Sequence, residues 1–124
     1  MISEHAEMLM HHGIDYEDAL HRFGGDVAMY EKFVFRFLND AHKYQDLKEA
    51  MARGDADTAH RIAHALKGVV GNVSFGEYHE AIGAVDQALR VGDLAQARKL
   101  MPPVDKAHYQ VMSALNELLC VSQN

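Results

Sequence analysis

The pair Gly-Asp occurs three times along this chain, at Gly25-Asp26, Gly54-Asp55 and Gly92-Asp93. Glycine adopts the left-handed conformation that ends many helices, and aspartate accepts hydrogen bonds from the free N–H groups at the start of the next helix. Each pair therefore predicts that one helix ends and another begins. The alternation of apolar and polar residues that is typical of strands is nearly absent. This pattern restricts the chain to an all-α fold.

Between these pairs lie helix-length segments with apolar residues at helical spacing. The predicted helices cover about residues 3–12, 15–23, 27–53, 56–73, 76–91 and 94–120, the last of them broken or kinked at Pro102-Pro103. The four long segments are amphipathic and have short links, which favours an antiparallel up-down four-helix bundle. We predict one domain over residues 1–124. A lead-in over residues 1–25, with one or two short additional helices, precedes a bundle over residues 26–121.

Charge and cysteine content narrow the classes of partner and location. The chain has 18 acidic and 12 basic residues and a net charge of −6, whereas nucleic acids and anionic membranes attract basic surfaces. We therefore expect no nucleic acid and no membrane as partner. The sequence predicts no signal peptide and no membrane span, and with Cys120 as its only cysteine it forms no internal disulfide. A cytoplasmic monomer is the expected state.

Nine histidines in 124 residues are unusual, because imidazole titrates near neutral pH and serves as nucleophile, proton carrier or metal ligand. Helical phase singles out His64 within the helix predicted after Gly54-Asp55. The apolar face of that helix carries Ala59, Ile62, Ala63, Leu66, Val69, Val70 and Val73. His64 lies near the middle of the opposite face and is therefore predicted to be exposed. His60, one turn earlier, is a candidate for tuning its environment, and the remaining histidines are expected to be solvated or structural.

Three neighbours of His64 on the polar face suggest a role for it. Lys67 lies one turn further on and can reach an anion attached to the imidazole. Gly68 and Gly71 follow on the same side, although each costs about 1 kcal/mol relative to alanine inside a helix. Their effect is to remove bulk beside the histidine, so that the backbone of another protein can approach closely. An exposed imidazole, an ammonium group and a flat glycine surface suit a histidine that carries a phosphoryl group.

The expected chemistry is phosphoryl transfer to and from this imidazole. Neutral imidazole is a good nucleophile near pH 7, and phosphoryl transfer needs mainly alignment and charge stabilisation from the protein. The sequence contains neither a G-x-x-x-x-G-K-[ST] loop nor a G-x-G-x-x-G turn for a nucleotide. A second protein must therefore supply the phosphoryl group, and we expect no cofactor and no metal.

The segment Ala63-His64-Ala65-Leu66-Lys67-Gly68 resembles the A-H-x-L-K-G core of histidine phosphotransfer (HPt) domains, the phosphorelay intermediates of two-component signalling. The resemblance covers about residues 13–121. Its other elements are Gly13-Ile14-Asp15, Ala19-Leu20 and Phe23-Gly24-Gly25-Asp26 in the lead-in, Gly71-Asn72-Val73 after the core, and Ala88-Leu89-Arg90-Val91-Gly92-Asp93 in the next helix. Ser74 departs from the pattern, because many members have glycine there. The departure concerns the turn between two helices.

The resemblance implies the function and its residues. His64 is phosphorylated on an imidazole nitrogen, Lys67 and Gly68 assist, and receiver domains dock over this helix and the next one. The protein would relay a phosphoryl group between aspartates of receiver domains, with response regulators and hybrid sensor histidine kinases as partners. It would be a phosphocarrier, not an enzyme with an ATP site. We expect Arg61, Ala65 and Asn72, on or beside the face of His64, to contact the partner.

Two other classes of protein fit parts of the pattern less well. Asp57 with His60, and Asp105 with His108, have the spacing of metal ligands in helical bundles, and His60 and His64 are one turn apart. Asp57, His60 and His64, however, are predicted to point away from the apolar face, whereas such ligands point inward.

The dimerisation helix of a sensor kinase also displays a histidine, but usually with an acidic residue directly after it and a proline further on. Ala65 follows here, without that proline.

Overall fold

A computed structural model describes residues 14–123, with the side chains of residue 16 and residues 117–123 left out. This part of the chain contains helices and no strands. The helices are α2 (Tyr16–Arg22), α3 (Val27–Asn39), α4 (His42–Ala52), α5 (Ala56–Asn72), α6 (Gly76–Arg90), α7 (Leu94–Lys99) and α8 (Met101–Gln123). The all-α prediction is confirmed, while the helix predicted over residues 3–12 lies outside the described residues.

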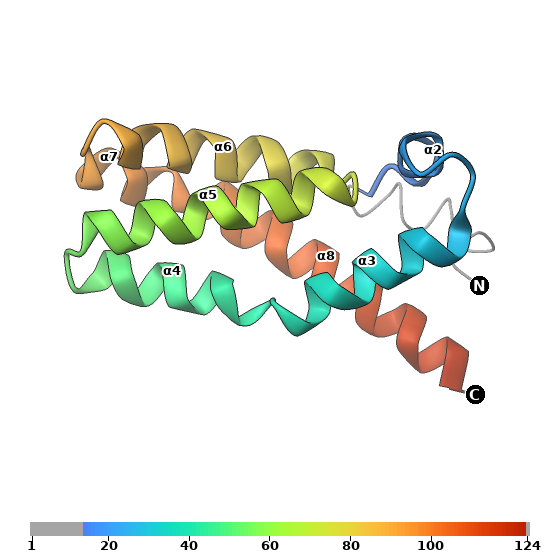
Figure 1. Cartoon of the computed structure of the whole chain (residues 1–124). Coiled ribbons are helices and arrows are strands. Elements are labelled where there is room, and N and C mark those ends of the chain that lie inside the picture. The colour runs from blue at the N-terminus through green and yellow to red at the C-terminus, as the bar shows by residue number, and fades with distance from the viewer. Residues whose placement is uncertain (1–13, 124) are drawn as a thin grey trace.

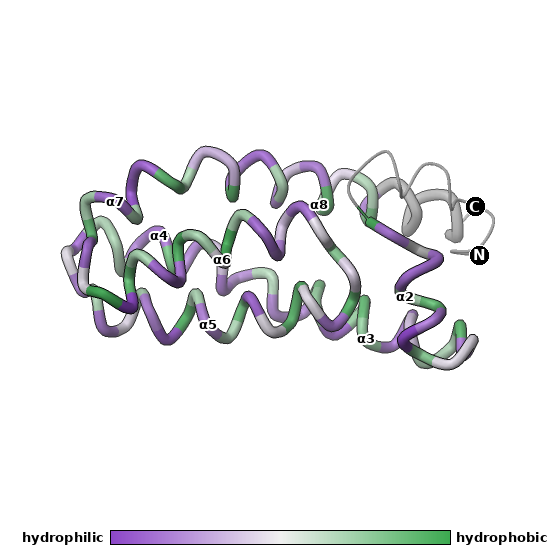
Figure 2. Tube along the Cα trace, turned by 90° about the horizontal axis from the view of Figure 1, so that it is seen from above, coloured by the Kyte–Doolittle hydropathy of each residue, from purple (hydrophilic) through white to green (hydrophobic). Residues whose placement is uncertain are grey.

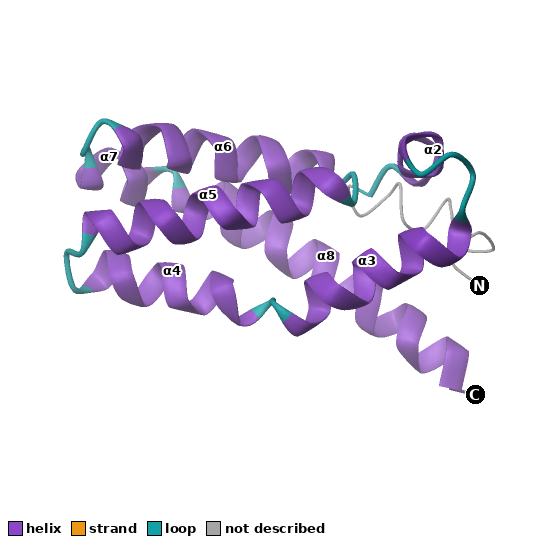
Figure 3. Cartoon of the chain, in the orientation of Figure 1, coloured by secondary structure: helices purple, strands orange, loops and turns teal. Residues whose placement is uncertain are grey.

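The long helices form an antiparallel bundle. Helix α5 packs against both α4 and α6, and α6 packs against α8, while α2 lies across one end of the bundle (Figure 1). Short loops join these helices (Figure 3). Polar residues interrupt the apolar ones along each helix (Figure 2), and none of the helices described is long and apolar enough to cross a membrane. The predicted four-helix bundle is therefore confirmed, with α3 and α4 together as its first member.

Each of the three Gly-Asp pairs separates two helices, as predicted. The aspartates Asp26, Asp55 and Asp93 accept hydrogen bonds of 3.0–3.1 Å from the backbone N–H groups of Met29, Thr58 and Gln96. The preceding glycines have φ angles of 78–83°, a left-handed conformation that residues with a side chain adopt at a cost. The sequence therefore defines where α3, α5 and α7 begin.

The prediction of one helix over residues 27–53 is wrong, because Asp40 and Ala41 separate α3 from α4. The N–H of Asp40 bonds to Phe37 O at 3.0 Å, and the N–H of Ala41 bonds to Leu38 O at 3.3 Å. Bonds of this i→i−3 kind tighten the backbone into a turn. No glycine or proline marks this point, and Asp40 is only a weak helix former. The apolar spacing continues across the turn and so predicted a single helix.

The last predicted segment does break, but before its two prolines. Helix α7 ends at Lys99 and α8 begins at Met101. The N–H of Leu100 bonds to the carbonyl groups of Gln96 and Ala97 at 3.1 Å. Both prolines therefore lie in the first turn of α8, where a missing N–H costs no helical hydrogen bond.

One histidine outside α5 has a clear structural position. His108 of α8 is buried at 8% exposure, its ring stacks on Tyr44 with centroids 3.8 Å apart, and its Nδ1 lies 2.8 Å from the Tyr78 hydroxyl. Burial lowers the pKa of His108. Tyr44 in turn donates a hydrogen bond to Asp105. His108 and Asp105 therefore contact tyrosines in the bundle, which agrees with the structural role expected for most of the histidines.

The turn between α5 and α6 is fastened to the N-terminal helices. Ser74 has a φ of 59°, which explains why glycine is favoured in this position. Its Oγ donates a 2.8 Å hydrogen bond to Asp18 Oδ2, and its carbonyl accepts one of 3.1 Å from the N–H of Asp15. The Ser74 hydrogen bond, with a smaller contribution from the charge of Arg22, lowers the pKa of Asp18. Tyr30 adds a 3.0 Å hydrogen bond to the Val73 carbonyl.

We predict that two substitutions of Ser74 distinguish the strain of its left-handed backbone from the stabilisation by its side-chain hydrogen bond. Ser74→Ala keeps the strained φ and loses the hydrogen bond, so the free energy of unfolding falls by about 1 kcal/mol. Ser74→Gly loses the same bond but relieves left-handed strain of about 1 kcal/mol, so its stability stays near that of the original chain. Urea denaturation measures both, with the exposed Ser113→Ala as control. Equal stability of the alanine and glycine variants would contradict this account.

Candidate functional site

Helix α5 buries one face and presents His64 on the other, as its helical phase predicted. Its buried residues Ala59, Ala63, Leu66 and Val70, with Val73 just after the helix, have exposures of 0–1%. The side chain of His64 is 67% exposed. Ile62 and Val69 lie at the borders of the buried face and are half-buried. His64 is therefore accessible to a second protein while its helix is fixed in the core.

A carboxylate that the sequence interpretation missed lies beside His64. Asp86 of α6 is only 5% exposed, and its Oδ1 lies 3.7 Å from His64 Nδ1 and 3.2 Å from His60 Nε2. A detectable signal was present, because Asp86 shares the helical spacing of buried Ile82 and Leu89. A lone carboxylate on an apolar helix face needs a donor or a positive charge nearby. Here the two imidazoles of α5 are in that position.

The contact with Asp86 gives the two nitrogens of His64 different surroundings. Nδ1 lies on the side of the buried carboxylate, which can accept a hydrogen bond from a nitrogen that carries a proton. Nε2 lies across the ring from Nδ1 and therefore away from Asp86. An imidazole that keeps its proton on Nδ1 has a free electron pair on Nε2, so this arrangement can present a nucleophile to a partner.

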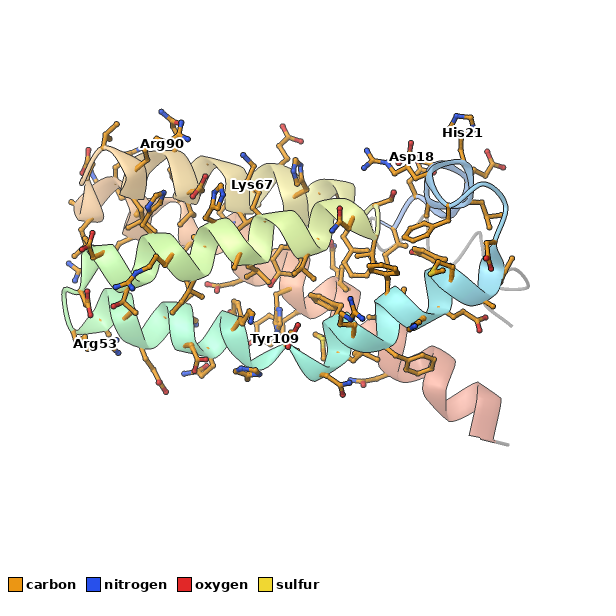
Figure 4. The ribbon with its side chains drawn as sticks, viewed as in Figure 1. Asp18, His21, Arg53, Lys67, Arg90 and Tyr109 are labelled. Atoms are coloured by element: carbon orange, nitrogen blue, oxygen red, sulfur yellow. The ribbon has the colours of Figure 1, made fainter. Side chains whose placement is uncertain are left out.

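Lys67 extends from α5 toward α6 (Figure 4), with its Cε 3.7 Å from the place where a Cβ on Gly83 would be. Gly83 was not predicted as part of the site. A Cβ there would be in ordinary van der Waals contact with the lysine stem, which therefore passes close to α6. Among the described residues, no acidic oxygen lies within ion-pair distance of the Lys67 ammonium. Its charge is therefore available to an anion near His64.

The two glycines beyond His64 have different surroundings. A Cβ on Gly68 would meet nothing within 4 Å, so the surface there is open. A Cβ on Gly71 would lie 2.9 Å from Cδ2 of His79 on α6. The chain thus has an internal reason for glycine at position 71, namely the close approach of the His79 ring. The prediction that a partner approaches closely at both glycines stays a prediction.

The polar face of α5 consists of two parallel rows of residues. The first, which we name the seam row, contains His60, His64, Lys67 and Gly71, each of which has Asp86, Gly83 or His79 of α6 as its neighbour. The second, the open row, contains Arg61, Ala65, Gly68 and Asn72, all exposed. Both rows follow helical spacing. The structure therefore groups the predicted site residues by whether they face α6 or the solvent.

The open row ends beside aromatic residues of the N-terminal helices. Asn72, Arg22, Phe23 and Phe33 line a hollow of about 320 Å³. Phe23 and Phe33 contact each other with ring centroids 5.3 Å apart. A partner that covers the open row therefore also reaches an apolar surface at its end.

Within the described part of the chain, no group of three or more His, Cys, Asp or Glu side chains could hold a metal ion. Asp105 and His108, one of the pairs with metal-ligand spacing, contact Tyr44 and Tyr78. His60 and His64 converge on Asp86 alone, which gives two imidazoles and one carboxylate oxygen. That arrangement places two imidazoles of α5 within ion-pair distance of one carboxylate of α6.

The fold and site combine an exposed imidazole on a four-helix bundle, a buried carboxylate beside it and a lysine one turn away, an arrangement expected of a phosphocarrier. Residues 34–119 match the family model of the Hpt domain. The chain belongs to this family. Searches of curated proteins and of solved structures gave no significant match. The predicted boundaries of the lead-in and the bundle stay predictions.

Membership in this family gives the general function. The protein takes part in histidine phosphotransfer within a two-component phosphorelay. Hpt domains are phosphocarriers that lack kinase and ATP-binding domains, and they interact with receiver domains and kinases of two-component systems. The resemblance noted in the sequence is therefore confirmed over residues 34–119, while its lead-in part stays a prediction.

We predict different stability effects for alanine at the two glycines of α5. Gly68→Ala meets no neighbour and improves helix propensity, so the free energy of unfolding rises by up to about 1 kcal/mol. Gly71→Ala brings its methyl group within 2.9 Å of the exposed His79 ring, which must rotate away, so stability gains less than in Gly68→Ala. Thermal and urea denaturation measure both changes. His79→Ala added to Gly71→Ala should restore the stability, and a clash-free Gly71→Ala would contradict this packing.

Proposed function

We propose that His64 is the phosphoacceptor and that its Nε2 carries the phosphoryl group. The observation that carries the proposal is the 3.7 Å contact between His64 Nδ1 and the buried Asp86 carboxylate. This contact favours a proton on Nδ1 and leaves the electron pair on Nε2. The 67% exposure of the same side chain lets a receiver domain bring its phosphorylated aspartate to that nitrogen.

The transfer is a displacement at phosphorus. The Nε2 electron pair forms the N–P bond, the bond between phosphorus and the partner's aspartyl oxygen breaks, and the electron pair of that bond stays on the partner's carboxylate. The imidazole ring becomes positively charged while Nδ1 keeps its proton. Asp86 stabilises this charge, because opposite charges attract strongly where little water intervenes. In the reverse direction the same atoms return the group to another aspartate.

Lys67 is assigned to the phosphoryl oxygens. Its stem lies over Gly83 of α6, which directs the ammonium along the same side of the bundle as His64. Its charge offsets that of the oxygens during transfer. Gly68 has no side chain to cover the adjacent surface, so a loop of the receiver domain can come close to the imidazole.

The partner is expected to cover the open row, where Arg61, Ala65 and Asn72 provide contacts around Gly68. All are exposed, so docking there does not disturb the core. These receiver domains are expected to be parts of response regulators and hybrid sensor histidine kinases. The monomeric state and the cytoplasmic location stay predictions of the sequence, of which gel filtration tests the first.

Incubation with a receiver domain phosphorylated on its aspartate should transfer label to this protein. The label should be stable in base and labile in acid, as expected for a phosphohistidine, and it should be absent from His64→Gln. His79→Gln, which changes another histidine near the same seam between helices, should be labelled like the original chain. Label that survives His64→Gln would overturn the assignment.

Replacing Lys67 with alanine should slow the transfer about 10- to 100-fold, the size expected when one charged contact to a transferring group is lost. The fold should be retained, since Lys67 lies on the polar face of α5. Rapid-quench kinetics with the same phosphorylated receiver domain measures the rate, and circular dichroism measures the fold. Lys106→Ala, which removes an exposed lysine of α8, is the control. An unchanged rate for Lys67→Ala would remove this residue from the site.

A further inference from the structure

His60 and Asp86 present two polar atoms that are buried together. His60 Nε2 and Asp86 Oδ1 are both enclosed and lack an aligned hydrogen-bond partner among the described residues, yet they lie only 3.2 Å apart. The side chain of His60 is 34% exposed, compared with 67% for His64 and 6% for Asp86. Of the two imidazoles that face the carboxylate, His60 is therefore the more enclosed and the closer.

A carboxylate enclosed in this way is costly to bury unless a donor or a cation lies beside it. In the described part of the chain, His60 Nε2 and His64 Nδ1 are the only basic nitrogens within 4 Å of its oxygens. No acidic oxygen other than that of Asp86 is this close to the His60 ring, whether from α4, α6 or α8. Along α5, Asp57 precedes His60 by one turn and His64 follows it by one turn. The orientation of the Asp86 carboxylate thus depends on these two histidines.

We propose that His60 is a positioning residue for phosphotransfer, which donates its Nε2–H to Asp86 and holds that carboxylate directed at His64 Nδ1. The inference rests on the proposed function of His64 and adds a residue to it. A small rotation of either side chain aligns the 3.2 Å contact into a hydrogen bond. His60 then binds the same carboxylate oxygen that lies beside His64, and the three residues form a chain of imidazole, carboxylate and imidazole.

The consequence for His64 concerns its tautomer. Histidine in water prefers the tautomer with its proton on Nε2, which lacks an electron pair for phosphorus at that nitrogen. An ionised Asp86 beside Nδ1 favours the other tautomer, in which Nε2 is the nucleophile. Without His60, the carboxylate has lost a donor, and it turns toward water, which supplies another. His64 then returns toward the tautomer that does not react at Nε2.

Nitrogen NMR of the unphosphorylated protein tests this step directly. The ¹⁵N shifts of His64 should report mainly the Nδ1–H tautomer in the original chain and a shift toward the Nε2–H tautomer in His60→Leu. His60→Gln should restore the original state, because its amide N–H can reach the same carboxylate. His79→Leu, which changes a histidine that forms no ion pair with Asp86, is the matched control. An unchanged tautomer in His60→Leu would overturn the proposal.

Transfer kinetics provides the second arm. His60→Leu should slow phosphoryl transfer from a phosphorylated receiver domain about tenfold, the effect of losing one hydrogen bond to a charged group, and His60→Gln should recover most of the rate. In an Asp86→Asn background, His60→Leu should have little further effect, because His60 acts through the carboxylate. A full effect of His60→Leu in that background would overturn the proposal.

The two arms separate this inference from the proposed function. Absence of label on His64 in the original chain would refute the phosphoacceptor assignment, while the tautomer measurement needs no phosphorylation. Normal labelling of His64 combined with an unaltered tautomer and rate in His60→Leu would refute only the role of His60.

Discussion

The contact between the buried Asp86 carboxylate and the imidazoles of α5 is the interaction on which the site depends. A carboxylate with 6% side-chain exposure is costly to bury unless donors face it, and these donors come from the adjacent helix. The contact therefore connects the chemistry of His64 with the rotation of α6 about its axis. A rotation that moved Asp86 away would expose apolar residues such as Ile82 and would remove the carboxylate from the two imidazoles.

The same dependence on α6 explains why the polar face of α5 is not uniform. Residues of the seam row have neighbours on α6, and small residues at the contacts let the two helices come together. The stem of Lys67 lies over Gly83, and Gly71 makes room for the His79 ring. Residues of the open row have no such neighbours and remain available to a partner. Glycines on one helix face thus serve two purposes, internal packing at position 71 and an open surface at position 68.

The alignment of α5 with α6 depends in turn on the connection between them. Ser74 has a left-handed conformation there. It donates a hydrogen bond to Asp18 of α2 and accepts one from Asp15, the residue preceding α2. Tyr30 of α3 and Arg22 of α2 add bonds to the carbonyl groups of Val73 and Gly71. The N-terminal helices therefore have a physical role in the site. They fasten the end of the hairpin whose two helices carry His64 and Asp86.

Patterns within one helix made most of the fold predictable, because caps, apolar spacing and the phase of His64 are local properties. The turn at Asp40 was missed because its apolar spacing continues without glycine or proline. Asp86 and Gly83 were missed for another reason: their roles exist only opposite α5. The spacing of Asp86 with Ile82 and Leu89 indicates burial, but the identity of its partner depends on how two helices are aligned. That alignment is set by a turn with serine where glycine is common. Helical phase alone therefore predicted that His64 is exposed, but it could not predict the carboxylate beside it.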